Sequence, residues 1–116
     1  MIRTELSLRL PNNAGALAGV CRLLLDARVN VLAMSLDTAG QLRLLVDNHV
    51  HGAGVLREGR HTVTERDVLV VETAAAPAAL QLIADAGVNL SYSYGAPHAL
   101  VLGVDDVMRA SAASGI

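Results

Sequence analysis

The chain has 116 residues, of which 53% are hydrophobic, and this is enough apolar surface to bury a core and to exclude disorder. Its net charge of −2, its lack of lysine and its two aromatic residues argue against binding to nucleic acid or to an anionic membrane, because such binding requires a basic stripe or stacking side chains. A single cysteine and an N-terminus without a long apolar stretch predict a cytoplasmic protein.

The first part of the chain alternates between strand and helix patterns. Residues 4–10 alternate polar and apolar side chains, which predicts a half-buried strand. A helix follows, with one apolar stripe formed by Leu17, Val20, Cys21, Leu24 and Leu25. Asn12 or Asn13 is placed to cap this helix. The next elements are two strands of a hairpin, over residues 29–36 and 41–46, and a helix through about Glu58 that Asp47-Asn48 can cap and two glycines weaken. A strand over residues 61–66 follows.

The pattern then starts again, which indicates an internal repeat. Residues 26–30 (DARVN) match residues 85–89 (DAGVN), each at the end of a predicted helix. The second series is a strand, a helix and a hairpin, over residues 67–73, 77–86, 89–94 and 98–104, and then a short last helix that Asp105-Asp106 can cap. We therefore predict a first repeat of residues 1–66 with the order β-α-β-β-α-β, and a second, truncated repeat of residues 67–116 that lacks its last strand.

The missing strand has a consequence for assembly. Without it, the strand over 67–73 has an unpaired side, and an apolar open edge favours pairing with another chain. We therefore predict a homo-oligomer, most simply a dimer. The alternative is that the run from Val63 to Thr73 serves both repeats.

The loop before the first helix is the candidate binding region. A helix N-terminus presents unpaired N–H groups and suits a carboxylate. Asn12 precedes the helix and Asn30 follows it, and we predict that their amides approach each other and hold a zwitterion. Gly15 leaves room for a ligand. Two plainer interpretations stay open, because Asn12 can be a helix cap and Asn30 a left-handed turn residue.

These residues resemble a known signature. The pattern Asn12-x-Ala14-Gly15-x-Leu17, followed by Val29-Asn30-Val31, is similar to that of ACT domains, in which the residue at position 14 is usually proline. The resemblance covers nearly the whole chain. It implies an α+β, ferredoxin-like fold of tandem βαββαβ repeats, with antiparallel sheets and helices on one face.

The resemblance also implies a function. Stand-alone tandem ACT proteins bind an amino acid or a related metabolite at a repeat or subunit interface. By analogy, the ligand-binding residues are Asn12, Asn13, Ala14, Gly15, Asn30 and Val31. Asn89 and Tyr92 form a possible second site, although the second repeat has neither the loop asparagine nor the Pro-Gly pair, and Tyr92 can equally be a packing residue.

No catalytic motif appears in the sequence, and we predict no enzyme activity, no cofactor and no metal. His49 and His51 are two residues apart and so point to different sides of a helix, whereas zinc ligands on a helix share one face. The leading prediction is a regulatory module that binds an amino acid. The alternative is an interaction or assembly subunit of a metabolic enzyme that needs no ligand.

Overall fold

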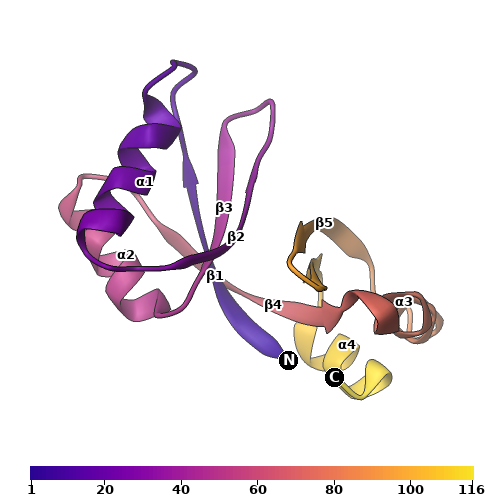
Figure 1. Ribbon diagram of the computed structural model, residues 1–116. Helices are drawn as coiled ribbons and strands as arrows, with labels where there is room; N and C mark the ends of the chain where they lie inside the picture. Colours follow the sequence, from indigo (N-terminus) through magenta and orange to yellow (C-terminus); the bar gives the residue numbers. More distant parts are fainter. The chain divides into compact units, whose positions relative to one another are not determined.

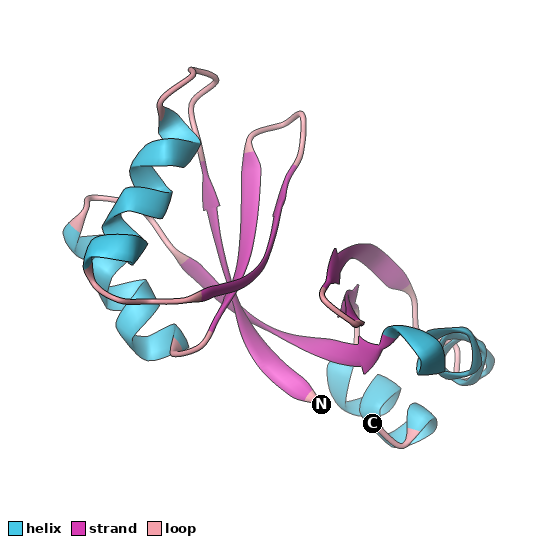
Figure 2. Ribbon diagram, viewed as in Figure 1, coloured by secondary structure: helices cyan, strands magenta, loops and turns pink.

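The computed structural model describes residues 1–116 (Figures 1 and 2). It contains six strands, four α-helices and one short 3₁₀ helix, η1. In chain order these are β1 (Ile2–Arg9), α1 (Ala16–Asp26), β2 (Val31–Leu36), β3 (Gln41–Val46), α2 (His49–Glu58), β4 (Thr64–Glu72), η1 (Thr73–Ala75), α3 (Ala76–Asp85), β5 (Leu90–Ala96), β6 (Ala99–Val104) and α4 (Val107–Ser114).

The predicted α+β order of elements is confirmed, with one difference at the centre of the chain. Two strands were predicted, over residues 61–66 and 67–73, and the structure has the single strand β4 of nine residues. No glycine or proline separates the two predicted strands, so the extended backbone continues through them. The alternative prediction, in which one run serves both repeats, describes this strand correctly.

The chain forms two compact units. The first unit is Glu5–Arg66, and the second unit is Met1–Thr4 together with Asp67–Ile116. The predicted repeats share the boundary after Arg66 with these units but differ in the placement of the first four residues. The strands follow one another in the order β2-β3-β1-β4-β6-β5, with antiparallel pairing of β1 with β3, β2 with β3, β4 with β6 and β5 with β6.

The second unit has no open edge at β4, so the predicted unpaired side is wrong. On one side of β4, Val70 pairs with Val101 of β6. On the other side, the Val70 N–H donates to the Met1 carbonyl at 2.8 Å, and the Met1 amino group donates to the Val70 carbonyl at 3.0 Å. The strand missing after α4 is thus replaced by the first residues of the chain, because β1 begins two residues earlier than predicted. The side of β4 therefore gives no basis for the predicted homo-oligomer.

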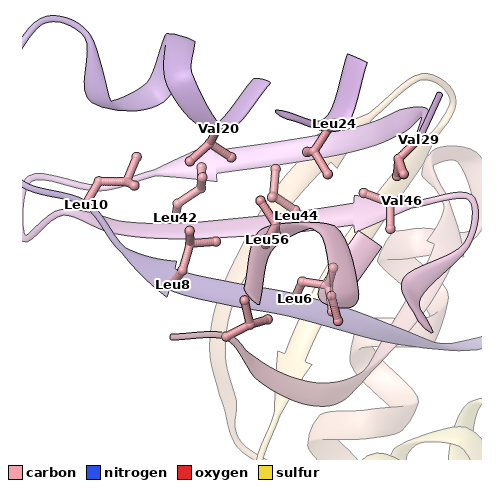
Figure 3. Close-up of a cluster of buried hydrophobic side chains, with 12 residues drawn as sticks. Leu6, Leu8, Leu10, Val20, Leu24, Val29, Leu42, Leu44, Val46 and Leu56 are labelled. Carbon is pink, nitrogen blue, oxygen red and sulfur yellow. The ribbon is translucent and has the colours of Figure 1, made fainter. Parts of the chain in front are cut away.

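The core of the first unit lies between its strands and its two helices. Figure 3 shows leucines of β1 and β3 pointing toward Val20 and Leu24 of α1 and Leu56 of α2. Side chains at alternate positions of the strands are buried here, as the period-2 pattern predicts. The buried members are Leu6, Leu8, Leu10, Val20, Leu24, Val29, Leu42, Leu44, Val46, Ala53, Leu56 and Val63.

Helix α2 forms in spite of its two glycines. Its predicted cap is confirmed, because the Asn48 side chain accepts a hydrogen bond from the His51 N–H at 3.1 Å. Gly52 faces the sheet, and a Cβ there would lie 3.1 Å from a methyl group of Val46 and 3.3 Å from one of Leu6. The glycine lets α2 approach the sheet closely, and this packing offsets its low helix propensity.

The apolar stripe of α1 is narrower than predicted. Leu25 is 67% exposed, and only Val20 and Leu24 are fully buried. Cys21 is half-buried and is the only cysteine. The second unit has a separate core with more alanine than the first, consisting of Leu69, Val71, Ala76, Ala79, Ile83, Val88, Leu102, Val104 and Ala110.

Candidate functional site

A cavity of about 540 Å³ lies in the first unit where the loop before α1 meets the β2–β3 turn. Strands β1 and β2 both pair antiparallel with β3, so they end at the same edge of the sheet (Figure 1). The Leu10 N–H donates to the Gly40 carbonyl at 2.8 Å and ties the turn to the end of β1. Gly40 has a φ of +83°, and a Cβ there would lie 2.6 Å from the Leu10 carbonyl oxygen. Only glycine therefore allows this close approach.

The helix end that faces the cavity is not capped by a side chain. The N-cap residue is Gly15, and neither Asn12 nor Asn13 donates to or accepts from α1 through its side chain, so the predicted Asn cap is wrong. The backbone closes the turn instead, since the Ala16 N–H donates to the Asn13 carbonyl at 3.3 Å. The two amide side chains are exposed and line the cavity without a hydrogen-bonding partner in the chain.

Two backbone donors are also free at this helix end. The N–H groups of Leu17 and Ala18 belong to the first turn of α1, where no carbonyl of the preceding turn is available. Neither makes a hydrogen bond in the chain, and Leu17 lines the cavity. The positive end of the helix dipole adds to their attraction for an anionic group.

Charges of both signs line the same cavity. The Arg9 guanidinium donates to the Ala39 carbonyl at 2.7 Å. Asp37 accepts from the N–H groups of Gln41 and Ala39, both at 3.0 Å, and lies 3.5 Å from the Arg43 guanidinium. These hydrogen bonds, with that from Gln41 the largest cause, lower the pKa of Asp37 below its ordinary value of 3.8. The cavity therefore holds a cation and an ionised carboxylate at neutral pH.

Asn30 and Val31 do not line this cavity, and the predicted convergence of Asn12 and Asn30 is wrong. Asn12 precedes α1 and Asn30 follows it, and Figure 1 shows the two connections at opposite ends of the helix. A helix of 11 residues is about 16 Å long, so the two amides are separated by roughly that length. The crossover from β1 to the parallel strand β2 requires this separation.

The Asn30 side chain has a structural partner instead. Its Nδ2 donates to one carboxylate oxygen of Asp47 at 2.9 Å, and its backbone N–H donates to the other at 3.1 Å. The Asp47 N–H returns a hydrogen bond to the Asn30 carbonyl at 3.0 Å. We call this arrangement the Asn–Asp clasp, and it joins the start of β2 to the end of β3. The side-chain hydrogen bond from Asn30 is the largest cause of the lowered pKa of Asp47.

The same clasp recurs in the second unit. The Asn89 Nδ2 donates to Asp105 at 3.2 Å, its N–H donates at 3.1 Å, and the Asp105 N–H donates to the Asn89 carbonyl at 3.1 Å. Asn89 is therefore occupied in the same way as Asn30. Tyr92 stacks with Tyr94 at a centroid distance of 6.3 Å, and its ring covers the Cα of Gly103, where a Cβ would overlap it.

The second unit has a counterpart of the first cavity, and neither Asn89 nor Tyr92 lines it. It is an open depression of about 590 Å³ beside Glu72, Thr73, Ala74 and His98. The Thr73 N–H donates to the His98 carbonyl at 2.9 Å, as Leu10 does to Gly40 in the first unit. No amide side chain lines this depression, and η1 continues directly into α3.

Arg9 and Asp37, which supply the charges of the first cavity, were not among the residues predicted from the sequence. A signal for them was present. Two parallel strands joined by a helix end at the same edge of a sheet, so the turn after the second strand must lie near the loop after the first. The residues that end β1 and begin the turn after β2 are Arg9 and Asp37.

No group of three or more His, Cys, Asp or Glu side chains is placed to hold a metal ion. None of the helices combines the length and the apolar character that crossing a membrane requires.

No family model matches the sequence, and neither does any curated protein. Solved structures do match. Protein BT0572 from Bacteroides thetaiotaomicron has a TM-score of 0.84 and 21% identity, over 97% of this chain and 86% of that one. The regulatory subunit of aspartate kinase from Thermus flavus has a TM-score of 0.69 and 14% identity, over 99% of this chain and 94% of the subunit. The fold is a tandem ACT-like fold.

The ACT-like fold predicted from the sequence is thus confirmed, and the match to the Thermus flavus regulatory subunit covers almost all of both chains. In a third match, the same fold is part of a larger protein. Escherichia coli aspartokinase III, solved in complex with lysine and aspartate in its T-state, has a TM-score of 0.61 and 17% identity, over 97% of this chain but 30% of the kinase. The ACT-like fold is therefore shared with a regulatory subunit of aspartate kinase and with part of an aspartokinase.

Proposed function

We propose that this ACT-like chain is a non-catalytic regulatory module that binds a free amino acid in the cavity between the loop before α1 and the β2–β3 turn. The observation that carries the proposal is the content of that cavity. It combines unused N–H donors at a helix end, two unpartnered amides, a guanidinium and an ionised carboxylate within one unit. A zwitterion needs both kinds of partner, and a cavity with only one sign of charge would not match it.

We expect the two ends of the ligand to bind different residues of the cavity. The α-carboxylate is held by the Leu17 N–H at the helix end, with Asn12 and Asn13 as further donors. The ammonium group is held by Asp37, whose carboxylate has capacity for another hydrogen bond. The small residue Ala14 and the N-cap Gly15 complete the loop.

Asn30 and Val31 take part in this proposal only through a second copy of the chain. Both lie away from the cavity of their own unit, but Val31 is on β2, which is an edge strand. A dimer that pairs along β2 would bring these residues to a subunit interface. We therefore propose that the chain forms an oligomer through β2, which is an edge strand, and not through β4.

The regulatory part of the proposal is a shift between two packings. A ligand changes such an equilibrium only through its differential affinity for the two states. Similar solved structures are described as regulatory subunits of aspartate kinase, and one kinase was solved with lysine and aspartate. We therefore propose that the partner of this chain is a metabolic enzyme whose activity follows the bound amino acid.

A thermal-shift screen of the twenty amino acids tests the binding. A ligand at one hundred times its Kd stabilises the native state by about 2.7 kcal/mol, which raises Tm by several degrees. Asn12→Ala is expected to abolish the shift. Gln81→Ala, which removes an exposed amide from α3 in the second unit, is the matched control and keeps it. No shift with any amino acid, or an equal shift in both variants, would contradict the proposal.

The alternative function, a ligand-independent assembly subunit, is favoured by one observation. Leu32, Met34 and Leu36 of the edge strand β2 are 40%, 40% and 47% exposed. They lie on one face at alternate positions, as expected for a surface covered by another protein. Met34→Lys should dissociate an oligomer that forms through β2, measured by sedimentation. If the assembly is unchanged by every amino acid and lost in this variant, the assembly function is the better description.

A further inference from the structure

A second cavity of about 410 Å³ lies in the first unit and belongs to no function proposed above. It is beside the end of β1 and the segment that joins α2 to β4. Its lining is basic and rich in hydroxyl groups, and contains no carboxylate. The polar side chains that matter here are Ser7, Arg9, Arg60, His61, Thr62 and Thr64.

These side chains are almost entirely without partners in the chain. Only Arg9 makes a side-chain hydrogen bond, to the Ala39 carbonyl, and a guanidinium has further donors to offer. Ser7 and His61 are half-buried, and neither side chain has a hydrogen-bonding partner in the chain. Such a set of donors in one cavity is suited to an external acceptor.

The backbone fixes two of these residues in place. The Arg60 N–H donates to the Arg57 carbonyl and the His61 N–H to the Leu56 carbonyl, both at 3.0 Å, which closes the end of α2. Arg60 has a φ of +70°, a left-handed conformation in which glycine is the usual residue. The guanidinium is therefore attached to a defined helix end and not to a free loop.

We propose that this cavity binds a phosphate group. Guanidinium groups bind phosphate oxygens through paired, charge-assisted hydrogen bonds, and the hydroxyl groups of Ser7 and Thr62 can donate to the remaining oxygens. The absence of a lining carboxylate removes the repulsion that would otherwise oppose an anion. The ligand class is a phosphorylated metabolite or free phosphate. It differs from the zwitterion of the first cavity, with which this one shares Arg9.

Arg60→Gly and Arg28→Gly test the proposal as a matched pair. Both arginines occupy the left-handed position at the end of a helix, with φ values of +70° and +59°. Both variants remove one positive charge and place glycine where the backbone favours it, so both should fold. Arg60 lines the cavity and Arg28 does not. Arg60 is also absent from the lining of the amino-acid cavity, so a failure here is separate from a failure of the proposed function.

The measurement is the Tm of each protein against inorganic phosphate, with sodium chloride at equal ionic strength as the reference. We expect phosphate to raise the Tm of the wild type and of Arg28→Gly, and Arg60→Gly to need at least about tenfold more phosphate for the same rise. The same measurement is made with glucose 6-phosphate. If it raises the Tm at a lower concentration than inorganic phosphate does, the ligand is a phosphorylated metabolite and not free phosphate. No rise beyond chloride, an equal rise in both variants, or a rise with succinate but not with phosphate overturns the proposal.

Discussion

The two units have the same arrangement of hydrogen bonds at both ends of their hairpins and differ most clearly in one loop. Both join the hairpin turn to the end of the first strand by a backbone hydrogen bond, from Leu10 to Gly40 and from Thr73 to His98. Both close the hairpin at its other end with an Asn–Asp clasp. They differ in the entry to the first helix, which is the open loop over 10–15 in the first unit and the 3₁₀ turn η1 in the second.

This difference distinguishes the residues that stabilise the fold from the residues that are available to bind a ligand. The residues that recur in both repeats, Asn30 with Asp47 and Asn89 with Asp105, are those that the structure uses for hydrogen bonds within each unit. The loop amides Asn12 and Asn13, which have no counterpart in the second repeat, are exposed, and their side chains have no partner in the chain. Recurrence between repeats therefore indicates what the fold needs, and binding is expected where the repeats diverge.

The largest effect is expected from matched core substitutions. Leu44 and Leu102 occupy corresponding positions on β3 and β6, and both are fully buried. Leu44→Ala and Leu102→Ala should each lower the free energy of unfolding by about 2–5 kcal/mol, through lost burial and the cavity that remains. Chemical denaturation measures this. Leu25→Ala, at a site 67% exposed, is the control and should change it by less than about 0.5 kcal/mol.

The two core variants also test whether the units fold as one. If both variants give a single transition with equal slope, the shared strands β1 and β4 couple the units. Two separate transitions, each moved by only one of the variants, would show that the units unfold independently.

The next largest effect is expected on ligand binding at Asp37. Asp37→Asn removes the negative charge that holds the ammonium group and should weaken amino-acid binding about tenfold, measured by calorimetry. Asp26→Asn, at the other end of α1 in an exposed ion pair with Arg22, should leave the affinity unchanged. Equal losses in both variants would remove Asp37 from the site.

The pH dependence of binding follows from the same carboxylate. The pKa of Asp37 lies below its ordinary value of 3.8, so the group stays ionised from neutral pH down to that value and loses its charge only below it. Affinity should therefore be constant over the neutral and mildly acidic range and fall as the pH drops through the pKa of the folded state. A decline that begins near neutral pH would indicate a different group.

The fold was predictable because its signals are local and repeated. Period-2 leucines predict β1, the i, i+3, i+4 stripe predicts α1, and the Asp-Asn and Asp-Asp pairs predict the caps of α2 and α4, which Asn48 and Asp106 provide. The replacement of the missing strand by Met1–Thr4 was not predictable from these patterns. It depends on pairing between residues that are almost 70 positions apart in the chain.

The candidate site was predicted only in part. Asn12 and Asn13 line the cavity because a loop before a helix is placed by the helix itself, and their role as ligand contacts stays a prediction. Asn30 does not lie near Asn12, because closeness in the sequence does not determine at which end of α1 a residue lies. A crossover between parallel strands carries the second residue to the far end of the helix, where Asp47 is the available partner.

Substitutions in the Asn–Asp clasps test whether the clasps stabilise the fold or take part in ligand binding. Asn30→Ala and Asn89→Ala each remove one side-chain hydrogen bond to an exposed carboxylate and should each lower the free energy of unfolding, by less than the core substitutions do. Equal losses, with amino-acid affinity unchanged in dilute protein, support a structural role. A loss of amino-acid affinity in Asn30→Ala alone would show that Asn30 contributes to ligand binding.

Acid unfolding adds a second measurement for the clasp of the first unit. Because the pKa of Asp47 is lowered in the folded state, its contribution to stability is present above its ordinary value of 3.8 and is lost as the pH falls through the folded-state value. Asn30→Ala removes the largest cause of the shift. The variant should therefore lose less stability than the wild type between pH 4 and strongly acidic conditions.

The smallest effect concerns the residue that ends the first helix of each unit. The N–H groups of Arg28 and Gly87 close the ends of α1 and α3 in the same way, at φ values of +59° and +76°. Glycine is free of the steric penalty that a side chain meets there, so Arg28→Gly should raise the free energy of unfolding by about 0.5–1 kcal/mol, and Gly87→Ala should lower it by a similar amount. Opposite signs in the two variants show that the backbone conformation decides the effect. A loss in both would mean that the Arg28 side chain makes a stabilising contribution larger than the strain of its backbone.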